Sequence, residues 1–130
     1  MGQSCLDATD GVCERHLLIA QSNDSLRRAL HRYFFRYFHK IFAAANPSDA
    51  ELALRDVNLE ITDLICGQDF GQGWPLGSEL ITTWRLICPS LRRVVLFTAR
   101  DDVPGDIPGV DAVCHKPMET AVLYSKLIET

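Results

Sequence analysis

The chain of 130 residues is long enough for one hydrophobic core and too short for two. Its composition, 47% hydrophobic and 23% charged, is that of an ordinary globular protein. The net charge of −4 gives no general attraction to nucleic acid or to an anionic membrane, so we expect neither as a partner. No apolar run reaches the roughly 18 residues of a membrane span, and no charged-then-apolar leader opens the chain, so we expect a cytoplasmic protein.

Residues 1–14 contain glycine, aspartate and serine, and we expect them to form a flexible leader before a single domain over residues 15–130. Two of the five cysteines, Cys5 and Cys13, lie in this leader. The cysteines show no metal-type spacing such as C-x-x-C. Those within the domain are therefore expected to be small buried hydrophobic residues.

The domain opens on HLLIA (residues 16–20), a continuous apolar run typical of a buried parallel strand. A long helix with one apolar stripe follows, and Phe35 falls outside that stripe. The stripe consists of Leu26, Leu30, Tyr33, Phe34 and Tyr37. KIFAAA (residues 40–45) predicts a second strand. The next segment, NPSDAELAL, predicts a helix with Asn46 as its N-cap and Pro47 at its first position.

DLIC (residues 63–66) predicts a third strand, followed by the loop GQDFGQGWPLG and the helical segment SELITTWRLI. RRVVLFTA is rich in β-branched and aromatic residues and predicts a fourth strand. The prolines and glycines of RDDVPGDIPG leave room for a very short fourth helix only. VDAVC predicts a fifth strand, and METAVLYSKLIE predicts a closing helix.

Five strands alternating with helices predict an α/β fold: a doubly wound, mostly parallel sheet with helices on both faces. In such a sheet the carboxyl ends of the strands converge on one crevice. The residues expected at these ends are Gln21, Ser22, Asn23 and Asp24, then Gln68 and Asp69, then Thr98 and Ala99, and finally Lys116 followed by Pro117.

The order of elements, together with LLIAQSNDSLRR, VVLFTA and CHKP, resembles the CheY-like receiver domain of response regulators from His16 to the end of the chain. The resemblance implies the flavodoxin-like strand order 2-1-3-4-5, here with a shortened fourth helix. Receiver domains take a phosphoryl group from a histidine kinase onto an aspartate after strand three. An acidic pair after strand one holds Mg²⁺, and a hydroxyl after strand four and a lysine after strand five contact the phosphoryl group.

Carried over by position, the resemblance implies a pocket with only part of this chemistry. Thr98 and Lys116 match the phosphate-sensing residues. Gln21 and Ser22 stand where the acidic pair belongs, and neither carries a charge. Asp24 follows at the start of the first helix, where we expect it to act as an N-cap.

Three registers are open for the phosphoacceptor position. Counting from Asp63 as the acidic residue that opens strand three gives Gln68, counting back from the glycine of GSELI gives Asp69, and a third register makes Asp63 itself the acceptor. We favour Gln68, which cannot form an acyl phosphate. Asp69 could form one, but with Asp24 it makes only a weak metal candidate, because Mg²⁺ requires more than one charged oxygen at such a site.

The leading hypothesis is a receiver-like signalling module that has lost efficient phosphotransfer, has no resident cofactor or enzymatic activity, and binds a histidine kinase or another signalling protein. A homodimer through the fifth strand and closing helix is a further option. One alternative is an active response regulator phosphorylated on Asp69 that uses Mg²⁺. Another is a small nucleotide- or flavin-binding α/β protein, although no G-x-G-x-x-G or G-K-[ST] follows the first strand.

Overall fold

A computed structural model describes residues 15–98 and 107–115. Its sheet contains five strands, all paired in parallel in the order β2-β1-β3-β4-β5. The strands are β1 (His16–Ala20), β2 (Lys40–Ala44), β3 (Asp63–Gly67), β4 (Arg93–Thr98) and β5 (Ala112–His115). The predicted α/β architecture and strand order are confirmed.

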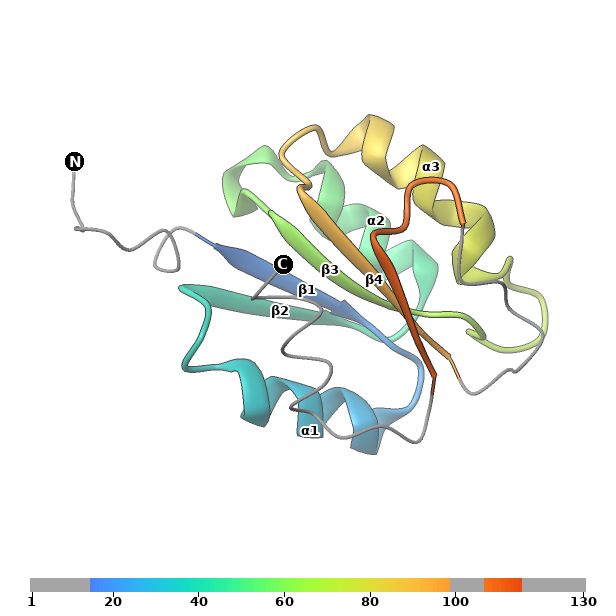
Figure 1. Ribbon diagram of the computed structural model, residues 1–130, viewed down its shortest axis with the longest axis horizontal. Coiled ribbons are helices and arrows are strands. Elements are labelled where there is room, and N and C mark those ends of the chain that lie inside the picture. Colours follow the sequence, from blue (N-terminus) through green and yellow to red (C-terminus); the bar gives the residue numbers. More distant parts are fainter. Residues whose placement is uncertain (1–14, 99–106, 116–130) are drawn as a thin grey trace.

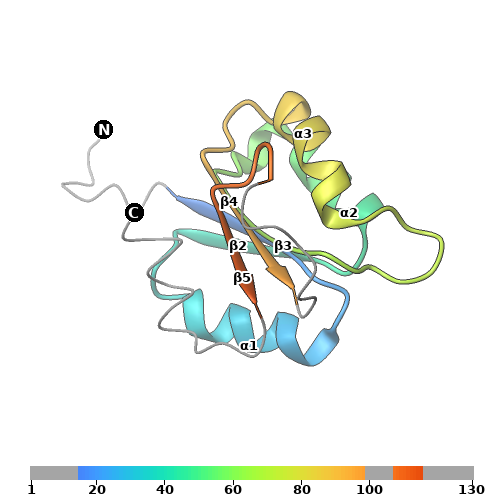
Figure 2. The same cartoon turned by 45° about the vertical axis from the view of Figure 1, so that its right-hand side comes forward.

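Helices cover both faces of this sheet. The described helices are α1 (Asp24–Phe34), α2 (Pro47–Arg55), the short 3-10 helix η2 (Val57–Leu59) and α3 (Gly77–Ile87). Figure 1 shows α1 below the sheet and α2 and α3 together above it, and the turned view in Figure 2 keeps this arrangement. No helix within the described residues is long and apolar enough to cross a bilayer.

Two apolar layers hold the helices against the sheet, because alternate residues of each strand point to opposite faces. On the α1 face, Leu17 and Ile19 pack with Leu30 and Phe34 of the helix. On the other face, the strands pack against α2 and α3 through residues that include Leu18, Leu64, Leu96, Ala50, Leu54, Ile81 and Trp84. The central strands β1 and β3 are buried along their whole length, as their continuous apolar sequences predict.

The predicted N-cap of α2 is confirmed, whereas the predicted N-cap of α1 is wrong. Asn46 caps α2, accepting a hydrogen bond from the Asp49 amide at 2.8 Å, and Pro47 is the first helical residue. Asn23, not Asp24, caps α1: its Oδ1 accepts from the Leu26 amide at 2.9 Å. The expectation that Asp24 is the N-cap is therefore wrong by one residue.

Several boundaries also differ from the predicted ones. Helix α1 ends at Phe34, so Tyr37 lies in the following turn, where its amide donates to the Phe34 carbonyl at 2.9 Å and its ring still packs on Phe34. Phe35 is 57% exposed, as its place outside the apolar stripe predicts. The sequence pattern did not predict η2, in which the Asp56 side chain accepts from the Asn58 amide.

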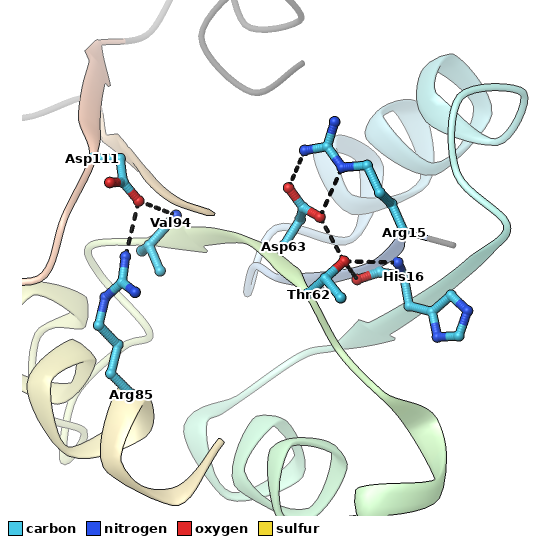
Figure 3. Close-up of polar contacts among 7 residues, drawn as sticks. All are labelled: Arg15, His16, Thr62, Asp63, Arg85, Val94 and Asp111. Atoms are coloured by element: carbon cyan, nitrogen blue, oxygen red, sulfur yellow. Dashed lines mark hydrogen bonds and ion pairs between the residues drawn. The ribbon is translucent and has the colours of Figure 1, made fainter. Parts of the chain in front are cut away.

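Arg85 of α3 connects this helix to the segment that enters β5. Its Nε donates to the Gly109 carbonyl at 2.7 Å, and its Nη2 bonds Asp111 Oδ2 at 2.9 Å. The same carboxylate oxygen accepts from the Val94 amide at 2.7 Å, as Figure 3 shows. We call these residues the Arg85–Asp111 brace. The predicted leader and closing helix, and most of the predicted short fourth helix, lie outside the described residues.

Candidate functional site

A cavity of about 220 Å³ lies at the carboxyl ends of three neighbouring strands in the middle of the sheet. Its lining comes from the residues that follow β1, the residues that follow β3, and the end of β4. These residues are Gln21, Ser22, Asn23, Gln68, Asp69, Phe97 and Thr98. The fold thus brings together six residues expected at the site, and it adds Phe97, which precedes Thr98 and had no separate signal in the sequence.

Gln21 follows β1 directly and is 2% exposed. Its Oε1 accepts a hydrogen bond from the Asn23 amide at 3.3 Å. Its Nε2 is buried and has no hydrogen-bond partner among the described residues. This side chain packs against the end of β3, where a Cβ built on Gly67 would lie only 2.9 Å from Nε2. The position therefore holds a carboxamide whose donor nitrogen is unsatisfied.

Ser22 and Gln68 use their side chains to hold the surrounding loops. The Ser22 hydroxyl donates to the Asp69 carbonyl at 3.1 Å. Gln68 is 5% exposed, and its Oε1 accepts from the Ser78 amide in the first turn of α3 at 2.8 Å. The Gly77 amide donates to the Gln68 carbonyl at 2.8 Å, an approach that needs glycine because a Cβ on Gly77 would lie 2.1 Å from the Gly67 carbonyl oxygen.

Asp69 supplies the only carboxylate among the described residues that line the cavity, and it is an exposed residue. Thr98 ends β4 and is 2% exposed. Lys116, which the sequence places after β5, lies outside the described residues. The described lining is therefore polar and carries one negative charge.

These residues do not fit a Mg²⁺ site. Mg²⁺ binds oxygen ligands, usually including carboxylates, in octahedral geometry. Asp69 supplies the one carboxylate among the described lining residues, and the unpartnered atom of Gln21 is a nitrogen, which donates hydrogen bonds and cannot coordinate a cation. Within the described residues, no group of three or more His, Cys, Asp or Glu side chains could hold a metal ion.

Asp24, the second weak metal candidate, does not line the cavity. Its carboxylate is ion-paired with Arg27 and Arg28 on the surface of α1. Arg27 also donates from Nη1 to the backbone carbonyl of Gln21 at 2.8 Å. Asp24 is therefore part of the first turn of the helix and is turned toward its own arginines.

Asp63, the third acceptor register, lies at the opposite end of β3 from the cavity. Figure 3 shows its buried carboxylate paired with the Arg15 guanidinium and accepting from the Thr62 hydroxyl, the latter at 2.7 Å. Thr62 in turn accepts from the His16 amide at 3.0 Å, so this network joins the amino ends of β1 and β3. Because Asp63 begins β3 and does not line the cavity, the register that makes it the phosphoacceptor is wrong.

Neither a protein-family model nor a curated protein matches the sequence. Solved structures do share its fold. A response regulator protein from Burkholderia pseudomallei, solved with a phosphorylated aspartic acid, a calcium ion and citrate, aligns with a TM-score of 0.72 and 17% identity over 87% of this chain and 66% of that chain. The CheY-like receiver domain protein of Methanospirillum hungatei aligns with a TM-score of 0.71 and 13% identity over 86% and 89% of the two chains.

A third structure extends the comparison to a multidomain protein. The signal receiver domain of an HD domain-containing protein from Pseudomonas fluorescens aligns with a TM-score of 0.73 and 16% identity over 86% of this chain and 90% of that chain. At these identities the likeness concerns the fold. It agrees with the parallel order β2-β1-β3-β4-β5. The chain therefore has the fold of a CheY-like response-regulator receiver domain.

Proposed function

We propose that this chain is a receiver-like signalling domain of a two-component pathway that works through protein contacts and has lost efficient Mg²⁺-dependent phosphorylation. The observation that carries the proposal is the chemistry of the cavity. Gln21, Ser22 and Gln68 occupy the strand ends where carboxylates would be required. The Ser22 and Gln68 side chains bond neighbouring segments, and Gln21 accepts from the Asn23 amide within its own loop. A cavity with this lining keeps the shape of a receiver site without its charge.

The sheet register supports Gln68 as the residue at the acceptor position. Gly67 pairs with Phe97, so continuing both strands by one residue sets Gln68 beside Thr98. Gln68 is buried at the cavity, whereas Asp69 is exposed beside it. A carboxamide in this position offers no anionic oxygen to attack a phosphodonor.

A described lining with a single carboxylate also has little need for a metal ion. In phosphoryl transfer to a carboxylate, a hard cation offsets the negative charges that gather around the phosphorus. With one described carboxylate at the cavity, there is little charge for a cation to offset. We therefore infer that the domain has no resident Mg²⁺ and no enzymatic activity, and that Thr98 and Lys116 are retained from a phosphate-sensing arrangement.

The proposed partners are proteins of the same pathway: a histidine kinase or another signalling protein, with a homodimer as a further option. We propose no nucleic-acid or membrane partner, since the chain carries a net charge of −4. The proposed location is the cytoplasm.

A second candidate function is an active, atypical response regulator phosphorylated on Asp69. The observation in its favour is that Asp69 lines the cavity with Thr98. A nucleotide- or flavin-binding role at the strand ends is less favoured, because this cavity, of about 220 Å³, lies below the roughly 300–1,000 Å³ of usual small-molecule sites.

Incubating the full chain with acetyl phosphate and Mg²⁺ separates the two candidates. We expect no added phosphoryl group by intact mass spectrometry and no saturable Mg²⁺ binding by calorimetry, because the cavity lacks the required carboxylates. Asp69→Asn is the matched variant. Stoichiometric Mg²⁺-dependent labelling of the unaltered chain that disappears in Asp69→Asn would establish the second candidate in place of the first.

A further inference from the structure

A larger cavity, of about 340 Å³, lies between the carboxyl ends of α2 and α3, near the segments that enter β3 and β4. Its base is formed by Leu54, Ile61 and Cys88, which are at most 4% exposed, and Val57 and Ile87 form its sides. Figure 1 shows α2 and α3 side by side on one face of the sheet. We call this cavity the α2–α3 groove.

The base of the groove is fixed by hydrogen bonds that do not involve a ligand. The carbonyl of Ile61 accepts from the Ser90 hydroxyl at 2.7 Å and contacts the Cys88 thiol at 3.6 Å. These contacts connect the turn after α3 to the segment that enters β3. The groove is therefore largely formed before anything binds, which lowers the ordering entropy that binding requires.

Val57 gives the groove an exposed apolar edge. It is the first residue of η2 and is 81% exposed, and it lines the groove together with the apolar residues Leu54, Ile61 and Ile87. A single exposed valine needs no explanation. An exposed valine at the edge of a preformed apolar groove extends the apolar surface that a bound side chain would cover.

The same edge carries negative charge. Asp56 and Glu60 line the groove, and none of the described lining residues is a lysine, arginine or histidine. The Asp56 carboxylate is partly occupied, since it accepts from the Asn58 amide at 3.0 Å. Within the described part of the chain, the Glu60 carboxylate takes part in no hydrogen bond or ion pair and is free to meet a cation from outside.

Glu60 has an unusual backbone conformation. Glu60 has φ 52° and ψ 49°, and it is the only non-glycine residue with positive φ in residues 15–98 and 107–115. Glycine or asparagine adopts this left-handed conformation more easily than glutamate. Glu60 is the C-cap residue of η2, and this conformation ends the 3-10 helix with a charged residue at the edge of the groove.

We propose that the α2–α3 groove binds a segment of a partner protein that inserts one bulky apolar side chain and places a lysine or arginine beside Glu60 and Asp56. Charge complementarity selects a basic segment, because Asp56 and Glu60 line the groove and none of its described lining residues carries a positive charge. The inference rests on the protein-contact function proposed above, for which it names a surface. It does not require the cavity at Gln68 to be occupied.

The test uses the immobilised full chain and a randomised peptide library, without Mg²⁺ or a phosphodonor. We expect the selected peptides to combine a bulky apolar residue with a nearby lysine or arginine. Glu60→Gln should weaken their binding about two- to fivefold through the lost charge pair, and Val57→Ser about tenfold through lost apolar burial. Because both side chains are exposed, these substitutions leave the core intact.

Two control variants match these changes outside the groove. Asp49→Asn removes one carboxylate from the first turn of α2, and Leu52→Ser removes an apolar side chain that is 68% exposed. Both should bind the selected peptides as the unaltered chain does. Failure to select any peptide, selection of peptides without basic residues, or equal effects of groove and control variants would each overturn the proposal.

Other occupants would also be recognised. Self-association that Val57→Ser abolishes, seen by analytical ultracentrifugation, would assign the groove to a second copy and overturn the peptide assignment. Labelling by acetyl phosphate remains a separate measurement. A chain that is not labelled and binds no peptide refutes the groove alone, whereas a labelled chain that binds basic peptides refutes only the loss of phosphorylation.

Discussion

At the scale of single residues, the buried pair Arg15–Asp63 shows how a charge can be needed for folding and still resemble a functional residue. Asp63 is 0% exposed and Arg15 is 9% exposed. The Arg15 guanidinium also lies over the Phe38 ring, 5.2 Å from its centroid. Removing one partner would leave the other charge buried without compensation.

We predict that Asp63→Asn lowers the free energy of unfolding by about 3 kcal/mol, because the guanidinium loses its counter-charge. The double variant Arg15→Met with Asp63→Leu should recover most of this loss, since neither charge is then buried. Urea unfolding followed by circular dichroism measures both. A double variant less stable than Asp63→Asn would show that the hydrogen bonds of the network outweigh its charge balance.

The Cys66 thiol should make the stability of the fold depend on pH. Cys66 is fully buried in β3, and burial raises the pKa of its thiol because the thiolate would lose its hydration. In the unfolded chain the thiol ionises near pH 9, so the folded state holds the proton that the unfolded state releases. The contribution of this thiol to the free energy of unfolding is therefore complete below about pH 9, and it is lost as the pH rises above that value.

We therefore predict that stability falls between about pH 8 and pH 10, by up to about 1.4 kcal/mol per pH unit from this group above its unfolded pKa. Urea unfolding under reducing conditions measures the slope. Cys66→Ala should have a flatter slope over the same interval, although its cavity lowers stability at every pH. Equal slopes in both proteins would mean that Cys66 is not the group responsible.

At the scale of secondary-structure elements, the Arg85–Asp111 brace holds the edge strand β5. The guanidinium also donates to the Leu91 carbonyl at 3.3 Å, so one side chain joins α3, the turn before β4 and the segment before β5. Gly109, which accepts from Arg85, has a φ of 83° that suits glycine. The brace thus takes part in positioning β5 beside β4.

We predict that Arg85→Met lowers the free energy of unfolding by about 2 kcal/mol, because Asp111 loses its ion pair and the Gly109 and Leu91 carbonyls lose the donor that Arg85 supplies. Amide hydrogen exchange should show the largest loss of protection in residues 112–115. Leu86→Ala, at a neighbouring exposed position of α3, is the control and should change neither quantity. A uniform loss of protection across the sheet would contradict a brace specific to β5.

The elements were predictable where one physical signal dominated. Continuous apolar runs located β1, β3 and β4, and Asn46 with Pro47 marked the start of α2. The start of α1 was wrong by one residue because Asn23 and Asp24 are both good caps, and only the geometry shows which oxygen reaches the Leu26 amide. The η2 turn lacked a repeating pattern and was missed for that reason.

The site was partly predictable for the same reason. Strand ends in a parallel sheet converge, so Gln21, Ser22, Gln68, Asp69 and Thr98 could be expected together before any coordinates. Their hydrogen bonds could not be expected, because those depend on loops of irregular conformation. Counting from Asp63 already favoured Gln68 over Asp69, and the pairing of β3 with β4 adds support to that prediction.

At the scale of the whole molecule, a receiver fold carries two cavities. The cavity at the carboxyl ends of the strands has one carboxylate in its described lining, and the α2–α3 groove, near the amino ends of β3 and β4, has an acidic edge. A fold does not by itself determine an activity. In the function proposed above, the cavity keeps the place of a receiver site at the strand ends and lacks most of its carboxylates. We therefore propose that the chain is not phosphorylated because carboxylates are missing from its cavity, and for no other reason.

Intact mass spectrometry after incubation with acetyl phosphate and Mg²⁺ tests this claim most directly when the unaltered chain is compared with the variant Gln21→Asp, Ser22→Asp, Gln68→Asp. We expect no labelling of the unaltered chain. We expect the mass of one added phosphoryl group on the variant, because the substitutions restore the carboxylate oxygens that hold Mg²⁺ and attack phosphorus. A folded variant that stays unlabelled would show that more than carboxylates is missing. Mg²⁺-dependent labelling of the unaltered chain would contradict the account.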